Sequence, residues 1–589
     1  MSAYGLLWIA AAFTASRANI PVSQAIFWVG MILLLLPAAI RVIKPNVGRS
    51  ERLAILMITG VALYMVKVLY SPILFTYLDE LQHWRTVQNI LISHHLYGFN
   101  PILTVSAVYP GLEIVTDALI SLTGLTIFQA GLIVIGVGRL VAVLALFLLF
   151  ERISTSSQVA GIGTLLYMAN PHFLLFDAQF AYESLALPLA VLTLYCAMRY
   201  ARLRGKGKLG FGLSAFGGMA AVIVTHHITS FVLASIFLLW TFILLIKIRP
   251  ILNRLVPTWI GIFGLIGIMA WITFVATQAI TYLSSPLTSA INDLIGLILG
   301  TRSARHLFVQ TGVNQPDFLL LRFLAISAVV LILAGLPFGA LKVWQKYRNN
   351  NLALVLTAIG LIYPVTLVVR YLPWGLIISS RTAPYIFLGI GFVLAVIYPN
   401  LRIPERNEWK YRSAFTAAVM LIFLGMIASG VAAWGLPVTY QQNSYTNSAD
   451  LQGEFASQWV LNTFGPYRRV AAEQDLLWEM GAYGLQRSIT PDTDRIWFDN
   501  FYSTPGLGPD KLQLLKSSKI QFLSIDQRNN SPLLLPKQAG TTSTGPVQAV
   551  PASQYISALS NIDQIRGISR IYDSGDIVTY DVGALTGEK

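Results

Sequence analysis

The sequence is poor in charged residues and almost free of cysteine. Only 12% of its 589 residues are Asp, Glu, Lys or Arg, whereas 55% are hydrophobic. A soluble domain carries roughly twice that charged fraction, so the composition excludes an ordinary soluble protein. The single cysteine, Cys196, lies within an apolar run, which excludes a disulfide framework and a thiolate metal site. We expect it to be a small buried residue.

Motifs of several enzyme classes are also missing. The chain holds no GxxxxGK[ST] phosphate loop and no GxSxG nucleophile elbow, so nothing in it indicates ATP hydrolysis or acyl transfer. The segment DELQH is not the HExxH zinc motif. The adjacent pair His226 and His227 would point to different sides of a helix, which disfavours joint metal binding.

What the sequence does contain is a series of long apolar runs. A helix needs roughly 20 apolar residues to cross a bilayer. Twelve runs suit such helices, and they lie at 22–40, 52–74, 130–150, 158–176, 181–198, 209–225, 228–246, 257–277, 319–340, 352–372, 382–399 and 413–435. The first fifteen residues form a thirteenth span or an interfacial helix, and they lack the basic region of a signal peptide. The sequence therefore predicts a polytopic α-helical membrane protein with 12–13 transmembrane helices.

Basic loops predict how the chain is threaded. Segments such as RYARLRGKGK, LKVWQKYR and LRIPERNEWKYR alternate with the spans on one side, and short basic loops stay in the cytoplasm. Residues 1–435 carry 29 Lys and Arg against 12 Asp and Glu, whereas residues 436–589 carry 12 against 15. The excess positive charge therefore indicates contact with anionic lipid headgroups and not with nucleic acid. The same alternation places 75–129, 278–318 and everything after 436 outside.

The composition changes after Trp434, and two domains are predicted. Residues 1–435 form the transmembrane module, and residues 436–589 have the polarity of a soluble extracytoplasmic α/β domain. The segments GEFASQWVLNTF, PDKLQLLKSS and ISALSNIDQI favour helices, YRRVAAEQ and KIQFLSID favour strands, and SRIYDSGDIVTYDV favours a hairpin that turns at DSGD. The Pro/Gly/Ser/Thr-rich segment LLLPKQAGTTSTGPVQAVPA is predicted to be a loop.

The first outer loop, residues 75–129, is too long for a simple connector. DELQHWRTVQNILISH has helical spacing, with one apolar face made of Leu81, Trp84, Val87, Ile90 and Leu91. PGLEIVTDALISLTG is apolar but carries Glu113 and Asp117, so we expect it to lie along the membrane interface. Two lateral helices are therefore predicted on the outer side.

Two acids and a histidine open the first lateral helix. Asp79 and Glu80 lie four and three residues before His83, so all three can share one side of the helix. Ionisable groups at membrane depth are costly and indicate function. The structural alternative is a capping box, with Asp79 as N-cap and Gln82 three residues later, but it leaves Glu80 and His83 without a purpose.

Cations on the outer side suit a phosphate ligand. Arg139 lies inside an apolar span and needs an anionic partner, and Arg381 lies where an outer span begins. An arginine binds phosphate through two parallel hydrogen bonds. Arg302, Arg305 and His306 in the 278–318 loop are equally well explained as interface residues.

Five more residues in outward turns are candidates for substrate binding. Asp177, Tyr182 and Glu183 belong to FDAQFAYES, and His226 and His227 belong to VTHHITS. Each has a polar side chain at the predicted outer edge of the membrane.

These segments together resemble a known superfamily. An outer loop that follows an early span, opens with LDELQH and continues through two lateral helices is similar to the GT-C membrane glycosyltransferases, which include the protein O-mannosyltransferases. NPHFLLFDAQFAYESLALPL, VTHHITSF and IYDSGDIVTYDV resemble a bacterial and archaeal branch of that superfamily. The resemblance implies an integral plasma-membrane enzyme that uses a polyprenyl-phosphate sugar donor and a glycan, lipid or protein acceptor.

The resemblance also implies roles for the candidate residues. Asp79 would be the general base that takes a proton from the acceptor hydroxyl, and Glu80 and His83 would orient the base or the acceptor. Arg139 and Arg381 would hold the donor phosphate. Because the lipid phosphate leaves as a stable anion and no DxD-like ligand set is present, we expect inversion with no cofactor and no required metal.

Three other functions are compatible with parts of the sequence. A lipid-linked glycan ligase would differ mainly by using a pyrophosphate donor. A polyprenyl-linked glycan transporter or flippase would share the spans and arginines, but we find neither an internal repeat nor paired broken helices. A non-catalytic scaffold would use the outer domain for binding. The sequence leaves open the sugar, whether hexose or pentose, the acceptor and the role of the outer domain.

Overall fold

The computed structural model describes the chain in two compact units. It covers all residues except 1, 76, 204, 206, 247–254, 302–318, 373–374, 402–404, 430–435, 438–448, 497, 499–500, 502–505, 529–532, 536–547, 551–560 and 589. The membrane unit holds the described residues of 1–70, 131–308 and 316–439, and the sheet unit holds those of 71–130 and 440–589. The predicted domain division at 435/436 stays a prediction. The compact units follow contacts instead, and they group the first outer loop with the C-terminal sheet.

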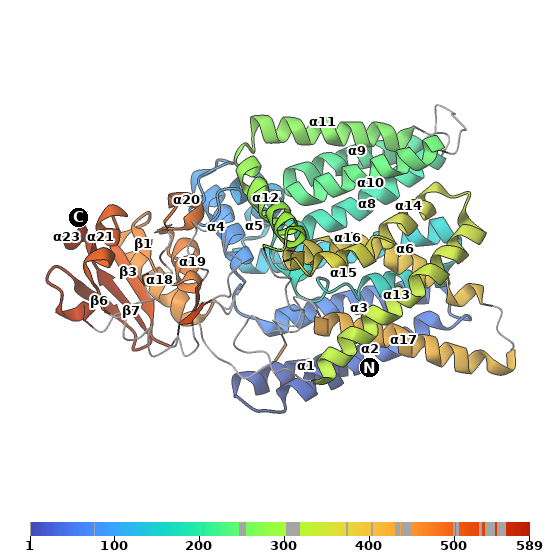
Figure 1. Ribbon diagram of the computed structural model, residues 1–589, viewed down its shortest axis with the longest axis horizontal. Helices are drawn as coiled ribbons and strands as arrows, with labels where there is room; N and C mark the ends of the chain where they lie inside the picture. The colour runs from blue at the N-terminus through green and yellow to red at the C-terminus, as the bar shows by residue number, and fades with distance from the viewer. Residues whose placement is uncertain are drawn as a thin grey trace. The chain divides into compact units, whose positions relative to one another are not determined.

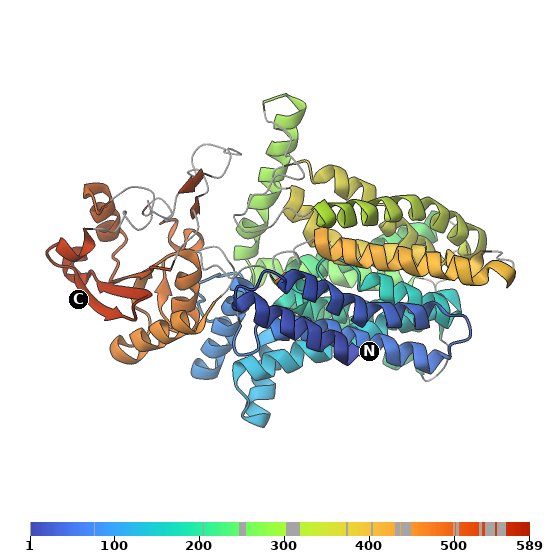
Figure 2. The same ribbon diagram turned by 90° about the horizontal axis from the view of Figure 1, so that it is seen from below.

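Long helices form the membrane unit (Figures 1 and 2). They are α1 (Ser2–Arg17), α2 (Ser23–Ile43), α3 (Arg49–Tyr70), α6 (Ile127–Ser154), α7 (Ser157–Tyr167), α8 (Tyr182–Arg202), α9 (Gly207–Thr225), α10 (His227–Ile246), α11 (Val256–Phe274), α12 (Gln278–Ile298), α13 (Leu319–Tyr347), α14 (Asn351–Gly360), α15 (Tyr363–Val369), α16 (Gly375–Ala395) and α17 (Glu408–Ser429). Short 3-10 turns lie at Phe176–Ala178, Tyr398–Asn400 and Glu405–Asn407. In the described residues, 11 segments are long and apolar enough to cross a membrane, which confirms a polytopic membrane protein.

One predicted span is not a full helix. The run 158–176 forms α7, which ends at Tyr167, and continues as turns. Pro171 disfavours helical geometry at Asn170, and the Asn170 side chain accepts hydrogen bonds from the backbone N–H groups of His172 and Phe173 at 2.9 and 3.0 Å. This local turn brings polar residues to the end of a short helix. The prediction of a helical span over 158–176 was therefore wrong.

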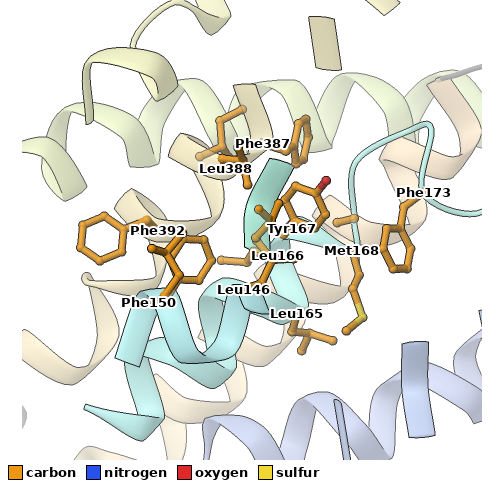
Figure 3. Close-up of a cluster of buried hydrophobic side chains, with 14 of the residues drawn as sticks. Leu146, Phe150, Leu165, Leu166, Tyr167, Met168, Phe173, Phe387, Leu388 and Phe392 are labelled. Atoms are coloured by element: carbon orange, nitrogen blue, oxygen red, sulfur yellow. The ribbon is translucent and has the colours of Figure 1, made fainter. Parts of the chain in front are cut away.

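The core of the membrane unit is aromatic and aliphatic (Figure 3). Phe150 of α6 lies against Phe392 of α16, with ring centroids 5.7 Å apart. Tyr167 at the end of α7 meets Phe173 in the following turn, edge to face at 6.1 Å. The first contact joins α6 to α16, and the second fixes the turn that follows α7.

The sheet unit combines the first outer loop with a mixed α/β fold. Its helices are α4 (Leu78–Ser93), α5 (Gly111–Thr123), α18 (Leu451–Phe464), α19 (Gln474–Ala482), α20 (Pro491–Asp494), α21 (Pro509–Ser517) and α23 (Gly583–Thr586), with 3-10 turns at Ser106–Val108 and Ile562–Gln564. Its strands are β1 (Arg469–Ala471), β2 (Arg487–Ser488), β3 (Phe522–Asp526), β4 (Leu533–Leu535), β5 (Gln548–Val550), β6 (Ser569–Asp573) and β7 (Ile577–Asp581). The two lateral helices, α18, α21 and the hairpin were predicted.

The main sheet has helices on both faces. Its strand order is β2-β1-β3-β7-β6, in which β2, β1 and β3 are parallel and β7 is antiparallel to both of its neighbours. Phe522 of β3 packs in one cluster with α18 and α19, whereas Leu523 packs in another whose rim includes residues of α21. The alternation along one strand therefore separates two apolar layers.

Parts of the C-terminal prediction need correction. Helix α19 was not predicted, because YRRVAAEQ was interpreted as a strand that enters a loop. The predicted loop LLLPKQAGTTSTGPVQAVPA contains β4 and β5, which pair antiparallel. The rest of that segment, and the first half of the predicted helix ISALSNIDQI, lie outside the described residues. The second half contains the 3-10 turn Ile562–Gln564.

Candidate active site

Glu80 caps the helix that carries it. Tyr77 is the extended N-cap residue of α4, and its backbone N–H donates to the Glu80 carboxylate at 3.2 Å. Glu80 is the third residue of the helix and is fully buried. This is the acid of a capping box, in a register two residues earlier than the one predicted. The inference that capping leaves Glu80 without a purpose was therefore wrong.

His83 is joined to an acid on the second lateral helix. Its Nδ1 lies 2.6 Å from Glu113 Oε1, and both side chains are fully buried between α4 and α5. The sequence prediction used Glu113 only to place α5 at the interface. The sequence did indicate that Glu113 has a partner, because a carboxylate in an apolar helix requires one. Glu113 is thus a site residue that the sequence reasoning missed.

Asp79 is the residue of the predicted trio that reaches solvent. It lies in the first turn of α4 and is half-buried, whereas Glu80 and His83 are fully buried. Its Oδ1 accepts a hydrogen bond from Gln82 Nε2 at 3.5 Å. The structure therefore separates the roles of the three residues. Glu80 and His83 organise the helix start, and Asp79 presents a carboxylate there.

The membrane unit holds a second group of charged residues around the turn after α7. Asp177 is buried at Phe176–Ala178, and its Oδ1 lies 3.9 Å from His172 Nδ1. Burial and the nearby Glu183 carboxylate raise the pKa of Asp177 to about 8. Within the described part of the chain, neither carboxylate oxygen of Asp177 and neither ring nitrogen of His172 has a hydrogen-bond partner.

Arg381 and Glu183 form an ion pair beside this turn. Arg381 Nη1 of α16 lies 3.2 Å from Glu183 Oε2 of α8, and the guanidinium stacks over the Phe176 ring at 4.2 Å. The side chain of Arg381 is 36% exposed, whereas that of Glu183 is 3% exposed. Arg381 is therefore a positioned cation with an accessible surface. We call His172, Asp177, Glu183 and Arg381 the acid–arginine cluster.

Arg139 is enclosed. Its Nη2 donates to the Phe173 carbonyl oxygen, and its guanidinium lies over the Phe173 ring at 3.7 Å from the centroid. Arg139 is 3% exposed and interacts electrostatically with Asp177. Whether an acid of this chain or a ligand phosphate is the anionic partner of Arg139 stays a prediction. This geometry fits a residue that holds the turn after α7.

Tyr182, His226 and His227 form an aromatic group next to the cluster. The Tyr182 ring stacks on His226 at 4.5 Å, and His227 meets Tyr182 edge to face at 5.8 Å. His226 Nδ1 lies 2.7 Å from the Thr229 hydroxyl, which in turn lies 2.6 Å from the Tyr385 hydroxyl. These hydrogen bonds fix the ring of His226 through α10 and α16.

Two further observations concern ions. In the part of the chain that the structure describes, no group of three or more His, Cys, Asp or Glu residues has the geometry of a metal site. That a metal is not required stays a prediction. Lys67 of α3 is fully buried within a span. It was not among the predicted site residues, although a lone cation in an apolar run indicates a functional residue. Arg302, Arg305 and His306 lie outside the described residues.

Comparisons with known proteins find likeness in fold and not in sequence. No protein-family model matches the chain, and a search of curated proteins finds no match. The oligosaccharyltransferase of Archaeoglobus fulgidus in its apo form superposes with a TM-score of 0.57 at 12% identity, over 90% of this chain and 80% of that one.

Two further solved structures show the same architecture. Archaeal oligosaccharyltransferase AglB from Archaeoglobus fulgidus, in complex with an inhibitory peptide and a dolichol-phosphate, gives a TM-score of 0.55 at 12% identity, over 82% of this chain and 70% of that one. The mycobacterial arabinofuranosyltransferase AftD gives 0.50 at 13% identity, over 90% of this chain and 41% of that one.

Proposed function

Because the chain has the fold of the GT-C membrane glycosyltransferases, we propose that it is a glycosyltransferase. It moves a sugar from a polyprenyl-phosphate donor to a hydroxyl of an extracytoplasmic glycan, lipid or protein. The observation that carries this proposal is Asp79, a half-buried carboxylate on a lateral helix whose start is fixed by Glu80 and by the His83–Glu113 contact. A rigid support of this kind suits a catalytic base.

The proposed reaction is a single inverting displacement. Asp79 accepts the proton of the acceptor hydroxyl while that oxygen forms a bond to the anomeric carbon. The bond between this carbon and the phosphate oxygen breaks, and its electron pair stays on the phosphate, which leaves as a stable anion. General-base catalysis of this kind contributes roughly 10²- to 10⁴-fold to the rate. The bonds and protons in this step balance without a metal ion.

Arg381 is the proposed anchor of the donor phosphate. It is the arginine of the acid–arginine cluster and keeps about a third of its side chain exposed. Its planar guanidinium suits phosphate. Arg139 is assigned a supporting role, because its guanidinium is buried against Phe173. Asp177, Tyr182, Glu183, His226 and His227 then shape the surroundings of that anchor.

A second candidate is transfer of a whole oligosaccharide from a pyrophosphate-linked lipid. The two structures with the higher TM-scores are both oligosaccharyltransferases, and this likeness favours that candidate. A transporter or flippase would need no carboxylate of the Asp79 type. The choice between these activities depends on the donor, so the test uses both kinds of donor.

The experiment is sugar transfer by the purified, reconstituted protein. Labelled polyprenyl-monophosphate and polyprenyl-pyrophosphate sugars are offered with cell-envelope acceptors, and wild type is compared with Asp79→Asn, with Arg381→Ala and with added EDTA. We expect monophosphate-dependent transfer that Asp79→Asn lowers by about 10²-fold or more, that Arg381→Ala weakens through the donor KM, and that EDTA spares.

Each contrary result points elsewhere. Full activity of Asp79→Asn would refute the base assignment. Transfer from the pyrophosphate donor alone would favour the ligase. Movement of intact donor across the bilayer without transfer would identify a flippase, and a folded protein with neither activity would favour the scaffold.

A further inference from the structure

A buried arginine joins the Asp79 helix to the C-terminal sheet. Arg85 is fully buried on α4, two turns after its start. Its Nη1 donates to the carbonyl oxygen of Gly481 and, at 3.3 Å, to that of Gln486. Gly481 belongs to the last turn of α19, where carbonyl groups have no partner within the helix and attract a positive charge. Arg85 therefore caps the carboxyl end of α19.

A tyrosine from the same segment holds the chain on the other side of Asp79. Tyr483 follows α19 directly, and its hydroxyl donates to the Phe75 carbonyl oxygen at 3.2 Å. Its ring meets Trp84 edge to face, with centroids 5.1 Å apart. Phe75 precedes Asp79 by four residues and Arg85 follows it by six. The C-terminal segment thus holds the backbone both before and after the acid.

A close approach of Gly481 to two neighbouring side chains completes this contact. A Cβ on Gly481 would come within 2.7 Å of Ile102 Cγ1 and 2.5 Å of Ser488 Oγ. Ile102 is itself fixed to α4 through Asn100, whose Oδ1 accepts from the Ile102 N–H at 2.9 Å and whose Nδ2 donates to the Gln82 carbonyl at 2.8 Å. The missing side chain of Gly481 therefore leaves room for Ile102 and Ser488 where the outer loop meets the end of α19.

From these contacts we propose that the segment at the end of α19, residues 481–486, is a positioning element for the catalytic base. The inference rests on the proposed function of Asp79 and assigns a role to the C-terminal portion, which sequence and fold leave open. Because the backbone is held at Phe75, before Asp79, and at Arg85, after it, the Asp79 carboxylate keeps one position. A misplacement of about 1 Å can cost roughly 10²-fold in rate. The three contacts therefore act on catalysis although none of them touches the substrate.

Two variants test the inference, each with a matched control in the same unit. Tyr483→Phe removes the hydroxyl that holds Phe75 and keeps the ring beside Trp84. Gly481→Ala adds one methyl group at the close approach. The control for the tyrosine is Tyr572→Phe, because the ring of Tyr572 on β6 packs on Trp459. The control for the glycine is Gly508→Ala before α21, because a Cβ on Gly508 would meet nothing within 4 Å.

Two readouts are taken on the full-length, reconstituted protein. The first is hydrogen exchange of the Glu80 and Leu81 amides, which donate to the Tyr77 carbonyl at 2.9 and 3.3 Å. The second readout is the kinetics of sugar transfer, with kcat and the KM for the donor measured separately. We expect both test variants to exchange faster at these amides and to lose about 10- to 100-fold in kcat, with donor KM unchanged. The controls should match wild type in both readouts.

The outcomes separate this inference from the proposed function. If both test variants behave like their controls, or if α4 exchanges faster while kcat is unchanged, the positioning role is refuted even though Asp79→Asn is inactive. If Asp79→Asn is fully active, the proposed base is refuted, whatever the exchange data show. If Gly481→Ala fails to fold, Tyr483→Phe decides, because it adds no atoms.

Discussion

At the scale of single residues, Asp79, Glu80 and His83 share the first turns of α4 but have different surroundings. The Glu80 carboxylate accepts a hydrogen bond from the N-cap backbone, and the His83 ring contacts Glu113. Of the three residues, only Asp79 is partly exposed to solvent. The partner of His83 comes from a helix 30 residues away in sequence. Helical periodicity carries no information about such a partner.

The His83–Glu113 contact should matter for stability. Replacing Glu113 with Leu removes the acceptor of a buried histidine and should lower the free energy of unfolding by about 1–3 kcal/mol. Glu113→Gln keeps an acceptor oxygen and should cost less. Thermal unfolding in detergent measures both changes. An equal loss in the two variants would show that the hydrogen bond is not the reason for the stability.

At the scale of elements, glycines allow α16 to approach its neighbours closely. A Cβ on Gly389 would lie 2.2 Å from the Leu356 carbonyl oxygen of α14, and one on Gly391 would lie 2.7 Å from the Gly163 carbonyl oxygen of α7. Small residues at such crossings let helix backbones pack in a membrane. Helix α16 also carries Arg381, so this packing positions the proposed phosphate anchor.

Enlarging one of these glycines should destabilise the membrane unit. Gly389→Ala should lower the free energy of unfolding by about 1–3 kcal/mol, because overpacking a tight contact forces the backbones apart. Gly217→Ala on α9 is the matched control, since a Cβ there meets nothing within 4 Å. Thermal unfolding in the same detergent compares them. Equal stability of the two variants would argue against tight packing of α16.

Two buried acids belong to α19, Glu473 at its N-cap and Glu479 near its carboxyl end. They should lower the stability of the sheet unit as the pH rises. Burial, and then the neighbouring Asp450, raise the pKa of Glu479 well above its usual value, and burial and Asp526 do the same for Glu473. Arg528 is the cation at this site, and it bridges Asp450 and Asp526 at 2.7 and 2.8 Å. Both glutamates therefore favour the protonated form in the folded protein.

The sign of the pH effect follows from these directions. Unfolding releases a proton from each acid once the pH exceeds the unfolded pKa of about 4.3. The contribution of the two glutamates to the free energy of unfolding is thus fully present below that pH. It falls as the pH rises toward the folded pKa, by up to about 1.4 kcal/mol per pH unit and group. Glu479→Gln should flatten the fall in thermal midpoint between pH 5 and pH 8. Glu588→Gln, at a less buried acid, should not.

At the scale of the whole molecule, charge and hydropathy determine how the chain crosses the membrane. The eleven spanning segments agree in position with eleven of the twelve predicted runs. The basic loops predict that the C-terminal portion faces outward. That placement is a prediction about the cell and has its own test.

Cysteine labelling can establish the orientation. The one native cysteine, Cys196, is 5% exposed and should react slowly. Ser517→Cys on α21 and Gly207→Cys at the start of α9 introduce exposed thiols. A membrane-impermeant maleimide on intact cells should label the first and spare the second, and inside-out vesicles should reverse this. Labelling of Gly207→Cys in intact cells would overturn the predicted topology.

The sequence by itself determined the properties that depend on local composition. Apolar runs predicted the spans, and basic loops predicted an orientation. Periodicity predicted α4, the apolar content of PGLEIVTDALISLTG predicted α5, and the turn at DSGD predicted the hairpin of β6 and β7. The short α7 was missed because hydropathy does not register the turn around Asn170 and Pro171. Helix α19 was missed because its stability comes from packing on a sheet and on α4, and not from its own pattern.

Only the tertiary structure decided which residues meet. The pairing of His83 with Glu113, the enclosure of Arg139, the half-buried ion pair of Arg381 and the contact of Arg85 with α19 all join segments far apart in the chain. Such contacts arise when buried polar groups find partners in three dimensions. The sequence supplies the groups, but folding selects the partners, and that selection separates a capping acid from a candidate base.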